Sequence, residues 1–113
     1  MASADDLRRL ALALPGTTEA PHFERAGFKV DRIYATLAPD GLSVNVRLEP
    51  VEQDFRCEAR PDAYRAIPNA WGAQGWTTVT LSALDAAELE TVLRGAWQNY
   101  GVKPPKAGKP RKR

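Results

Sequence analysis

The stretch Leu42-Ser43-Val44-Asn45-Val46-Arg47-Leu48 alternates apolar and polar side chains. Such alternation is typical of a β-strand with one buried face and one face in water. Parallel strands are usually buried on both faces and have continuous apolar runs, so the pattern favours an antiparallel sheet. Pro39-Asp40-Gly41 has the residues of a hairpin turn, which predicts that residues 33–37 form the neighbouring strand.

Three further segments are predicted to be extended. Residues 17–23 alternate around Pro21, and a proline favours an edge strand because it cannot donate a ladder hydrogen bond. Residues 28–30 form a short apolar strand, and residues 76–81 form one rich in β-branched side chains. Residues 62–65 are expected to form a single helical turn instead.

Three helices are predicted from capping residues and from apolar side chains three and four residues apart. The first begins at the N-cap Ser3 and ends before Pro15-Gly16. The third follows a capping box at Asp85 and ends at Gly101, where a left-handed C-cap is expected. The second begins at Pro50, and its apolar residues at helical spacing are Val51, Phe55 and Ala59.

The order of these elements predicts the fold class and the domain organisation. Helices that flank and interrupt a run of strands favour an α+β fold, with an antiparallel sheet of four to five strands packed by helices on one face. With 113 residues the chain has room for one such domain, which we place at residues 1–102. Residues 103–113 are expected to be a disordered basic tail, because they offer nothing to bury.

The charge is distributed unevenly along the chain. Six of the sixteen basic residues lie in the tail, so ten basic residues and all fourteen acids remain in residues 1–102, which carry a formal charge of −4. The folded part alone is therefore expected to attract DNA only weakly. The tail can bind DNA or RNA by releasing counterions, and it equally suits a solubilising terminus or contact with an acidic protein. Its cations are Lys103, Lys106, Lys109, Arg111, Lys112 and Arg113.

Composition excludes several classes of protein. No apolar run reaches the roughly 20 residues of a membrane helix, and the N-terminus lacks the layout of a signal peptide, so we expect a cytoplasmic protein without membrane association. Cys57 is the only cysteine, which excludes an intrachain disulfide and a thiolate metal cluster. No metal site and no cofactor are predicted.

Two tryptophans frame the stretch Trp71-Gly72-Ala73-Gln74-Gly75-Trp76, which is expected to be an irregular loop. Exposed indoles in such a loop provide a stacking platform for nucleic-acid bases. Alternatively, Trp76 belongs to the core and Trp71 caps the sheet edge. Three cations are candidates to hold the phosphates, or else are solvated charges that pair with nearby acids: Lys29, Arg32 and Arg47.

The sequence offers few residues that could support an enzymatic reaction. His22 is the only histidine, and beside Glu19 and Glu24 it could act as a general base in a hydrolase-type reaction. However, no nucleophile at a recognisable turn accompanies it. Cys57 is a poor nucleophile because neighbouring acids oppose the thiolate. A non-enzymatic protein is therefore predicted.

Several short motifs, taken in order, resemble those of the MmcQ/YjbR-like family of small bacterial proteins. The motifs are Leu14-Pro15-Gly16-Thr17-Thr18-Glu19, Pro21-His22-Phe23, Phe28-Lys29-Val30, Asp40-Gly41, Trp71-Gly72, Gly75-Trp76 and Ala96-Trp97. The resemblance implies a frataxin/CyaY-like α-β sandwich and DNA binding without a defined catalytic set. Relatives often carry basic residues where this chain has Ala73 and Gln74. Frataxin-type iron binding is not carried over, because the first helix offers only Asp5 and Asp6.

Together these observations predict a non-enzymatic protein that binds nucleic acid weakly through the tryptophan loop, the sheet face and the tail. In the loop and the sheet, the candidate contacts are Trp71, Gln74, Trp76, Lys29, Arg32 and Arg47. The alternative is a module that binds a protein or a small ligand. Affinity that falls steeply with salt distinguishes the first from an apolar protein interface.

Overall fold

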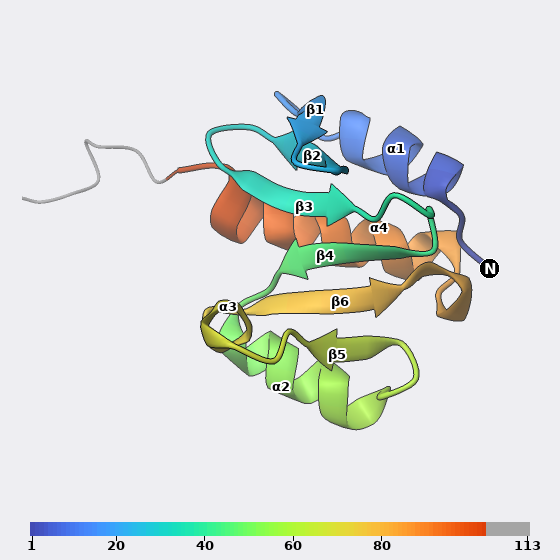
Figure 1. The fold of residues 1–113 in the computed structure, drawn as a ribbon, viewed down its shortest axis with the longest axis vertical. Helices are drawn as coiled ribbons and strands as arrows, with labels where there is room; N and C mark the ends of the chain where they lie inside the picture. The colour runs from blue at the N-terminus through green and yellow to red at the C-terminus, as the bar shows by residue number, and fades with distance from the viewer. Residues whose placement is uncertain (104–113) are drawn as a thin grey trace, which may run out of the picture.

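The computed structural model describes residues 1–103 (Figure 1). Its strands are β1 (Thr18–His22), β2 (Arg25–Lys29), β3 (Ile33–Leu37), β4 (Ser43–Arg47), β5 (Tyr64–Ala66) and β6 (Trp76–Thr80). Its helices are α1 (Ala4–Leu12), α2 (Pro50–Ala59), α3 (Ala70–Ala73) and α4 (Ala86–Ala96), followed by a π-helical turn over Trp97–Gly101. A 3₁₀ turn over Leu81–Ala83 connects β6 to α4.

The strands form one six-stranded antiparallel sheet in the order β1-β2-β3-β4-β6-β5. The antiparallel α+β prediction is confirmed, although the sheet has more strands than the four to five expected. The helical turn predicted for residues 62–65 was wrong, because Tyr64 and Arg65 pair with Val79 and Thr78 of β6. Strand β6 thus lies between β4 and the short edge strand β5.

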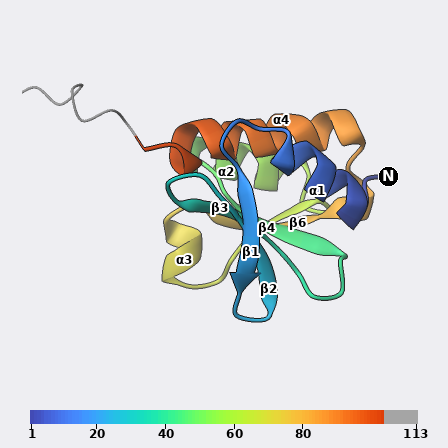
Figure 2. The ribbon, with the colours of Figure 1, turned by 90° about the horizontal axis from the view of Figure 1, so that it is seen from above.

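Helices α1, α2 and α4 all lie on one face of the sheet (Figure 2). The core fills the space between them, with Phe28, Val44 and Val79 of the sheet facing Leu89 and Leu93 of α4, all fully buried. We call the opposite side of the sheet the open face. As predicted, one face of the sheet is covered by helices.

Capping chemistry explains where the long helices begin. Ser3 accepts a hydrogen bond from the backbone N–H of Asp6, and the Asp6 carboxylate accepts one from the backbone N–H of Ser3. Asp85 caps α4 by accepting from the N–H of Glu88 at 2.8 Å. Both N-caps were predicted from the sequence.

The C-terminal end of α4 differs from the prediction. Gly101 is not in a left-handed conformation, since the glycines with positive φ among the described residues are Gly16, Gly41 and Gly75. Gly101 instead lies against the ring of Tyr34, where a Cβ atom would come within 2.6 Å of Tyr34 Cδ2. Glycine is therefore needed there for close packing, and the chain ends the helix with a π-helical turn.

A second difference concerns which side chains are buried. Leu42 is 67% exposed because β4 begins only at the next residue, and Leu42 belongs to the turn held by Asp40. On α2, Val51 and Phe55 are 82% and 71% exposed. The predicted helix is present, but its apolar stripe points to solvent.

Helix α2 is anchored to the sheet by polar contacts instead. The buried side-chain amide of Gln53 donates to the carbonyl of Gly72 at 2.9 Å and to Thr77 Oγ1 at 3.1 Å, with a longer contact to the carbonyl of Trp76 at 3.3 Å. These bonds tie α2 to both α3 and β6.

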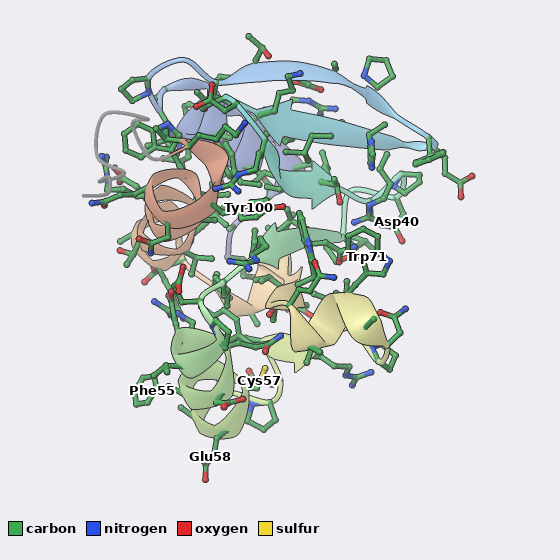
Figure 3. All side chains as sticks on the ribbon, turned by 90° about the vertical axis from the view of Figure 1, so that its left-hand side faces the viewer. Asp40, Phe55, Cys57, Glu58, Trp71 and Tyr100 are labelled. Atoms are coloured by element: carbon green, nitrogen blue, oxygen red, sulfur yellow. The ribbon has the colours of Figure 1, made fainter. Side chains whose placement is uncertain are left out.

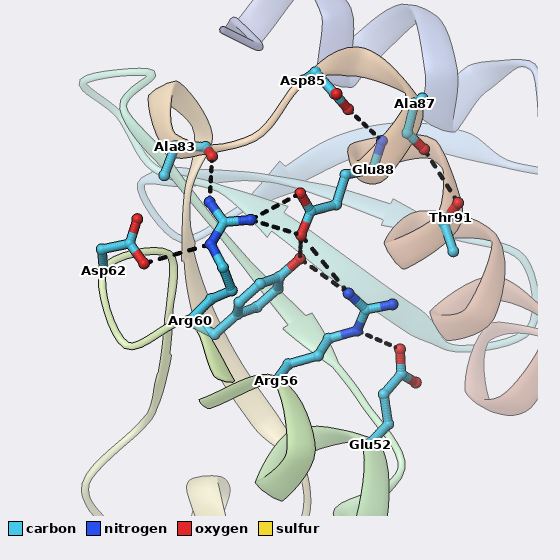
Figure 4. A network of polar contacts seen from close by, with 10 residues as sticks. Glu52, Arg56, Arg60, Asp62, Ala83, Asp85, Ala87, Glu88 and Thr91 are labelled. Carbon is cyan, nitrogen blue, oxygen red and sulfur yellow. Dashed lines mark hydrogen bonds and ion pairs between the residues drawn. The ribbon is translucent and has the colours of Figure 1, made fainter. Parts of the chain in front are cut away.

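A network centred on Glu88 joins α2 and β5 to α4 (Figure 4). The Tyr64 hydroxyl donates to Glu88 Oε2 at 2.6 Å, and Arg60 donates to Glu88 Oε1 at 3.1 Å. Arg56 lies 3.8 Å from the same carboxylate and donates to Glu52 at 2.7 Å. Burial raises the pKa of Tyr64, and the hydrogen bond to Glu88 raises it further, so the phenol stays protonated as a donor.

Replacing Gln53 by leucine tests this polar anchor. The variant roughly keeps the side-chain volume but removes the buried amide that donates to the Gly72 carbonyl and to Thr77 Oγ1, so we expect a loss of about 1–3 kcal/mol in unfolding free energy. Urea denaturation followed by tryptophan fluorescence measures it. The matched variant Gln98→Leu changes an exposed glutamine and should shift stability by less than about 0.5 kcal/mol. Equal effects of the two changes would show that the Gln53 contacts contribute nothing.

Candidate functional site

The pleat of the sheet separates the charges of the strands. Because alternate residues point to opposite faces, the pairing places Arg25, Lys29, Arg47 and Arg65 on the open face. The strands contain a single carboxylate, Glu19, which lies on the helix side and pairs with Arg8 of α1 at 3.1 Å. The charged strand residues of the open face are thus all cationic.

A groove of about 520 Å³ lies on the open face. Its lining contains Arg25 and Arg32 and no carboxylate. The other lining residues are His22, Phe23, Ile33, Thr36, Asn45, Ile67, Trp71, Trp76 and Tyr100. The groove therefore combines aromatic rings with guanidinium groups, although the folded part of the chain is acidic as a whole.

Three aromatic rings form a row along one side of this groove. The rings of Trp71 and Trp76 are 6.5 Å apart at an interplanar angle of 76°, and those of Trp76 and Tyr100 are 6.2 Å apart at 79°. Both contacts are edge-to-face, which is a favoured geometry for aromatic pairs. Trp76 is half-buried, whereas Trp71 at the outer end is 58% exposed. Figure 3 shows Trp71 on α3 and Tyr100 near the turn that follows α4.

The segment that holds Trp71 is more regular than predicted. Residues 70–73 form helix α3, whose N-cap Asn69 accepts from the backbone N–H of Trp71 at 2.8 Å. A Cβ at Gly72 would lie 1.7 Å from the carbonyl oxygen of Ile67, and one at Gly75, where φ is +113°, would lie 2.0 Å from that of Leu48. The two glycines thus allow close backbone packing, which fixes the orientation of the indoles.

Each arginine around the groove retains free N–H donors. Arg25 donates to Thr36 Oγ1 at 2.9 Å and to the carbonyl of Thr36 at 3.0 Å, and Arg32 donates through Nε to the carbonyl of Tyr100 at 2.8 Å. Arg32 and Arg47 both lie over the ring of Tyr100, at 4.2 and 4.5 Å from its centroid. A guanidinium has five N–H donors, so each can still bind an anion. The carboxylate of Glu49 lies 3.9 Å from Arg47, a distance too long for a strong ion pair.

Phe23 stands at the tip of the β1–β2 hairpin, at the end of the groove near His22. Its φ is +59°, which makes it the only described residue other than glycine with a positive φ, and its side chain is 92% exposed. The ring touches little except His22, whose ring centroid is 4.8 Å away in an edge-to-face contact. A bulky residue rarely adopts this backbone conformation, and when it does the strain often marks a functional site.

The structure brings some of the predicted site residues together and separates others. Trp71, Trp76 and Arg32 line the groove, and Arg47 lies beside it on Tyr100. Lys29 is on the same sheet face but outside the groove, and exposed Gln74 ends α3 without lining it.

The tail is mostly outside the described residues. The backbone N–H of Lys103 donates to Asp31 at 2.8 Å. The other predicted contacts of the tail lie outside the described residues, as does the segment 104–113 that was predicted to be disordered. These contacts are Lys106, Lys109, Arg111, Lys112 and Arg113.

Sequence reasoning missed Arg25, Phe23 and Tyr100. Arg25 is identifiable from the pleat, because it lies three residues before the buried Phe28 on the same strand and so points to the opposite face. No local pattern in the sequence predicts that Tyr100 lines the groove, because the groove forms only where the end of α4 meets β4 and β6. The exposure of Phe23 follows from its turn position.

The groove has no evident catalytic set. Among residues 1–103, the His22 side chain has no hydrogen bond to a carboxylate or to a nucleophile. Cys57 is half-buried, and burial raises the pKa of its thiol, which opposes thiolate formation. Within the described part of the chain, no three His, Cys, Asp or Glu side chains gather in a way that could hold a metal ion.

Comparison with known proteins places this arrangement in a family. The YjbR family model matches residues 12–99, a range that contains the whole sheet and all of α4. The chain belongs to the YjbR family. This confirms the resemblance found in the sequence motifs, and the open-face groove is formed by residues within the YjbR region together with Tyr100, which directly follows it.

A solved structure supports the same conclusion for the fold. The crystal structure of a Deinococcus radiodurans protein with a DUF419 domain has a TM-score of 0.78 and 28% sequence identity, and the match covers 95% of this chain and 85% of that one. No curated protein matches the chain. Within residues 1–103, no helix has the length and apolar character needed to span a bilayer.

Proposed function

We propose that this YjbR-family chain is a non-enzymatic cytoplasmic protein that binds single-stranded nucleic acid on the open face of its sheet. The observation that carries the proposal is the groove itself, whose lining combines aromatic rings with guanidinium groups and contains no carboxylate. Unstacked bases bind such rings, and phosphates bind such cations. The proposal concerns binding without strong sequence preference.

The aromatic row favours single strands over a duplex. Bases in a duplex are already stacked on one another, whereas a single strand presents free base faces to Trp71 at one end of the groove and to Phe23 at the other. Each base stacked on an aromatic side chain contributes about 1–3 kcal/mol. The rigid α3 holds Trp71 in place before the ligand arrives, which lowers the entropic cost of binding.

The separation of charges between the two faces of the sheet also supports binding of a polyanion on the open face. A net charge of −4 over residues 1–102 opposes binding of a polyanion at long range. At contact distance, however, interactions between exposed charges are screened beyond roughly 8–10 Å in physiological salt, so the local set of cations matters most. That set on the open-face strands is Arg25, Lys29, Arg47 and Arg65.

Fluorescence anisotropy of a labelled oligothymidine, in a salt series, tests the proposal. We expect both the full chain and a truncation to residues 1–103 to bind, with affinity falling as salt rises and with weaker binding to a duplex of the same length. The truncation keeps the contact between Lys103 and Asp31. If only the full chain binds, and duplex and single strand bind alike, the tail alone is responsible and the open face has no such function.

Replacing Phe23 by glycine should separate stability from binding. Glycine adopts the +59° φ without strain, and the lost residue is 92% exposed. The free energy of unfolding of the variant should therefore be about 1 kcal/mol higher than that of the wild type. The same change should weaken oligothymidine binding by roughly tenfold, because one stacking surface is lost. Thermal denaturation and anisotropy measure the two effects. A variant that is stabilised but binds normally would remove Phe23 from the site.

One observation favours a second candidate, a small planar anion. The groove volume of about 520 Å³ lies in the range of small-molecule sites. The groove lining places the guanidinium groups of Arg25 and Arg32 in the same groove as the rings of Trp71 and Trp76. A ligand with an acceptor group on an aromatic ring would suit them. Competition between a nucleoside monophosphate and oligothymidine would be consistent with either function. Binding of the monophosphate without any binding of oligothymidine would favour the small-anion site.

A further inference from the structure

We propose that the outer face of α2 is a docking surface for a basic amphipathic helix of a partner protein. This surface is on the helix layer, away from the open-face groove, so the proposal does not depend on nucleic-acid binding. It consists of the apolar residues Val51, Phe55 and Ala59 and the acidic residues Asp54, Glu58 and Asp62, which we call the α2 face.

The apolar half of the α2 face follows the spacing of a helix-packing ridge. Val51, Phe55 and Ala59 are four residues apart, so their side chains lie in one row along the helix. All three are exposed, and Phe55 points away from the domain in Figure 3. Such four-residue rows are the ridges with which one helix packs against another.

The outward position of this row is fixed by the polar side of the same helix. Buried Gln53 bonds to Gly72 and Thr77, and Arg56 bonds to Glu52 and Tyr64. Turning the apolar row inward would break these contacts and leave buried polar groups without partners, which is unfavourable. The apolar row is therefore a permanent surface of the fold.

The acidic half indicates the charge of the partner. Asp54 and Glu58 are four residues apart on α2, and like charges at this spacing destabilise a helix, while Asp62 follows shortly after the helix ends. Among the described residues, neither Asp54 nor Glu58 has an ion-pair partner, and Asp62 has a contact to Arg60 at 3.5 Å. Figure 3 shows Glu58 pointing away from the domain at the lower end of α2. Lysine or arginine on the partner would relieve this repulsion.

The same charges argue against a second copy of the chain as the occupant. In a symmetric dimer the α2 face would meet itself, and the row from Asp54 to Asp62 would face another acidic row. A helix with an apolar stripe flanked by basic residues matches both halves of the face. Its length need be only about three turns to cover residues 51–62.

A synthetic peptide of roughly 18 residues, with leucine at helical spacing and lysine elsewhere, is a suitable probe. Titration into the ¹⁵N-labelled full chain should shift backbone amides of α2, with an affinity that falls as salt rises. Phe55→Ser should weaken binding on the order of tenfold, and so should the double change Asp54→Lys with Glu58→Lys. The control Leu42→Ser removes a similarly exposed apolar side chain outside the α2 face and should leave the affinity unchanged.

Three results would overturn the proposal. In the first, a peptide with glutamate in place of lysine binds equally well, so charge plays no part. In the second, the amide shifts fall on the open face rather than on α2. In the third, the chain self-associates at micromolar concentration and Phe55→Ser abolishes this, which would make a second copy the occupant. The substitutions are at exposed positions, so the ¹⁵N spectrum of each variant should remain that of a folded domain.

Discussion

Replacing Gly72 by alanine is expected to lower the unfolding free energy by at least ~3 kcal/mol. The added Cβ would lie 1.7 Å from the carbonyl oxygen of Ile67 and 2.8 Å from its carbonyl carbon. Both atoms belong to the backbone, so no side chain can move aside, and α3 would have to leave its place. Gln53 would then lose its bond to the Gly72 carbonyl as well.

Chemical denaturation measures this effect, and Gly95→Ala is the matched control. A Cβ at Gly95 meets only Glu52 Oε1 at 3.8 Å, which is ordinary contact, and Gly95 is inside α4. Alanine there should stabilise the protein by roughly 0.5–1 kcal/mol, because it favours the helix. If both variants change stability by similar amounts, α3 does not pack on Ile67 as the structure shows.

The double change Trp71→Ala with Arg47→Ala is expected to weaken binding of oligothymidine by roughly 100-fold. Trp71 supplies the most exposed ring of the aromatic row, and Arg47 supplies a guanidinium over Tyr100 with no strong partner of its own. Their losses should be close to additive, since one acts on bases and the other on phosphates. The fold should persist because Trp71 is 58% exposed.

The matched variant for this prediction is Phe55→Ala with Arg94→Ala. It also removes one exposed aromatic ring and one exposed arginine, but from the helix layer. Its affinity for oligothymidine should remain within about twofold of the wild type, the small change expected from one lost surface charge. An equal loss in both variants would mean that aromatic and cationic content, and not the open-face groove, governs binding.

Local patterns in the sequence predicted most of the fold. The alternation from Val44 to Leu48 and the caps at Ser3 and Asp85 depend on neighbouring residues only, and the structure confirms them. Two of the failed predictions, at residues 62–65 and at Gly101, have a common reason. In both, a long-range contact overrides local propensity: pairing of β5 with β6, and packing of Gly101 on Tyr34.

The candidate site was predictable only in part. Trp71 and Trp76 were identified from their composition and spacing, but the groove also needs Tyr100 from the end of α4 and Arg25 from β2. Net charge does not locate the cations of the open face, because it sums residues on both sides of the sheet. The single strand carboxylate, Glu19, lies on the helix side, where it contributes nothing to the open face.

Helix α2 shows a different limit of sequence patterns. Its apolar residues have the spacing of a buried stripe, and nothing in the local sequence reveals that Gln53 is buried instead. The partners of Gln53 lie in α3 and β6, and the nearest of them in sequence, Gly72, is 19 residues away. An amphipathic pattern predicts the helix, whereas tertiary hydrogen bonds decide which side faces the core.

The most direct measurement compares two charge-reversal variants of residues 1–103 by anisotropy with labelled oligothymidine. Arg47→Glu with Arg65→Glu alters the open face, and Arg9→Glu with Arg94→Glu alters exposed arginines of the helix layer by the same net charge. We predict that the first variant loses measurable binding while the second retains most of its affinity. Equal losses in the two variants would contradict it, because binding would then depend on overall charge and not on the open face.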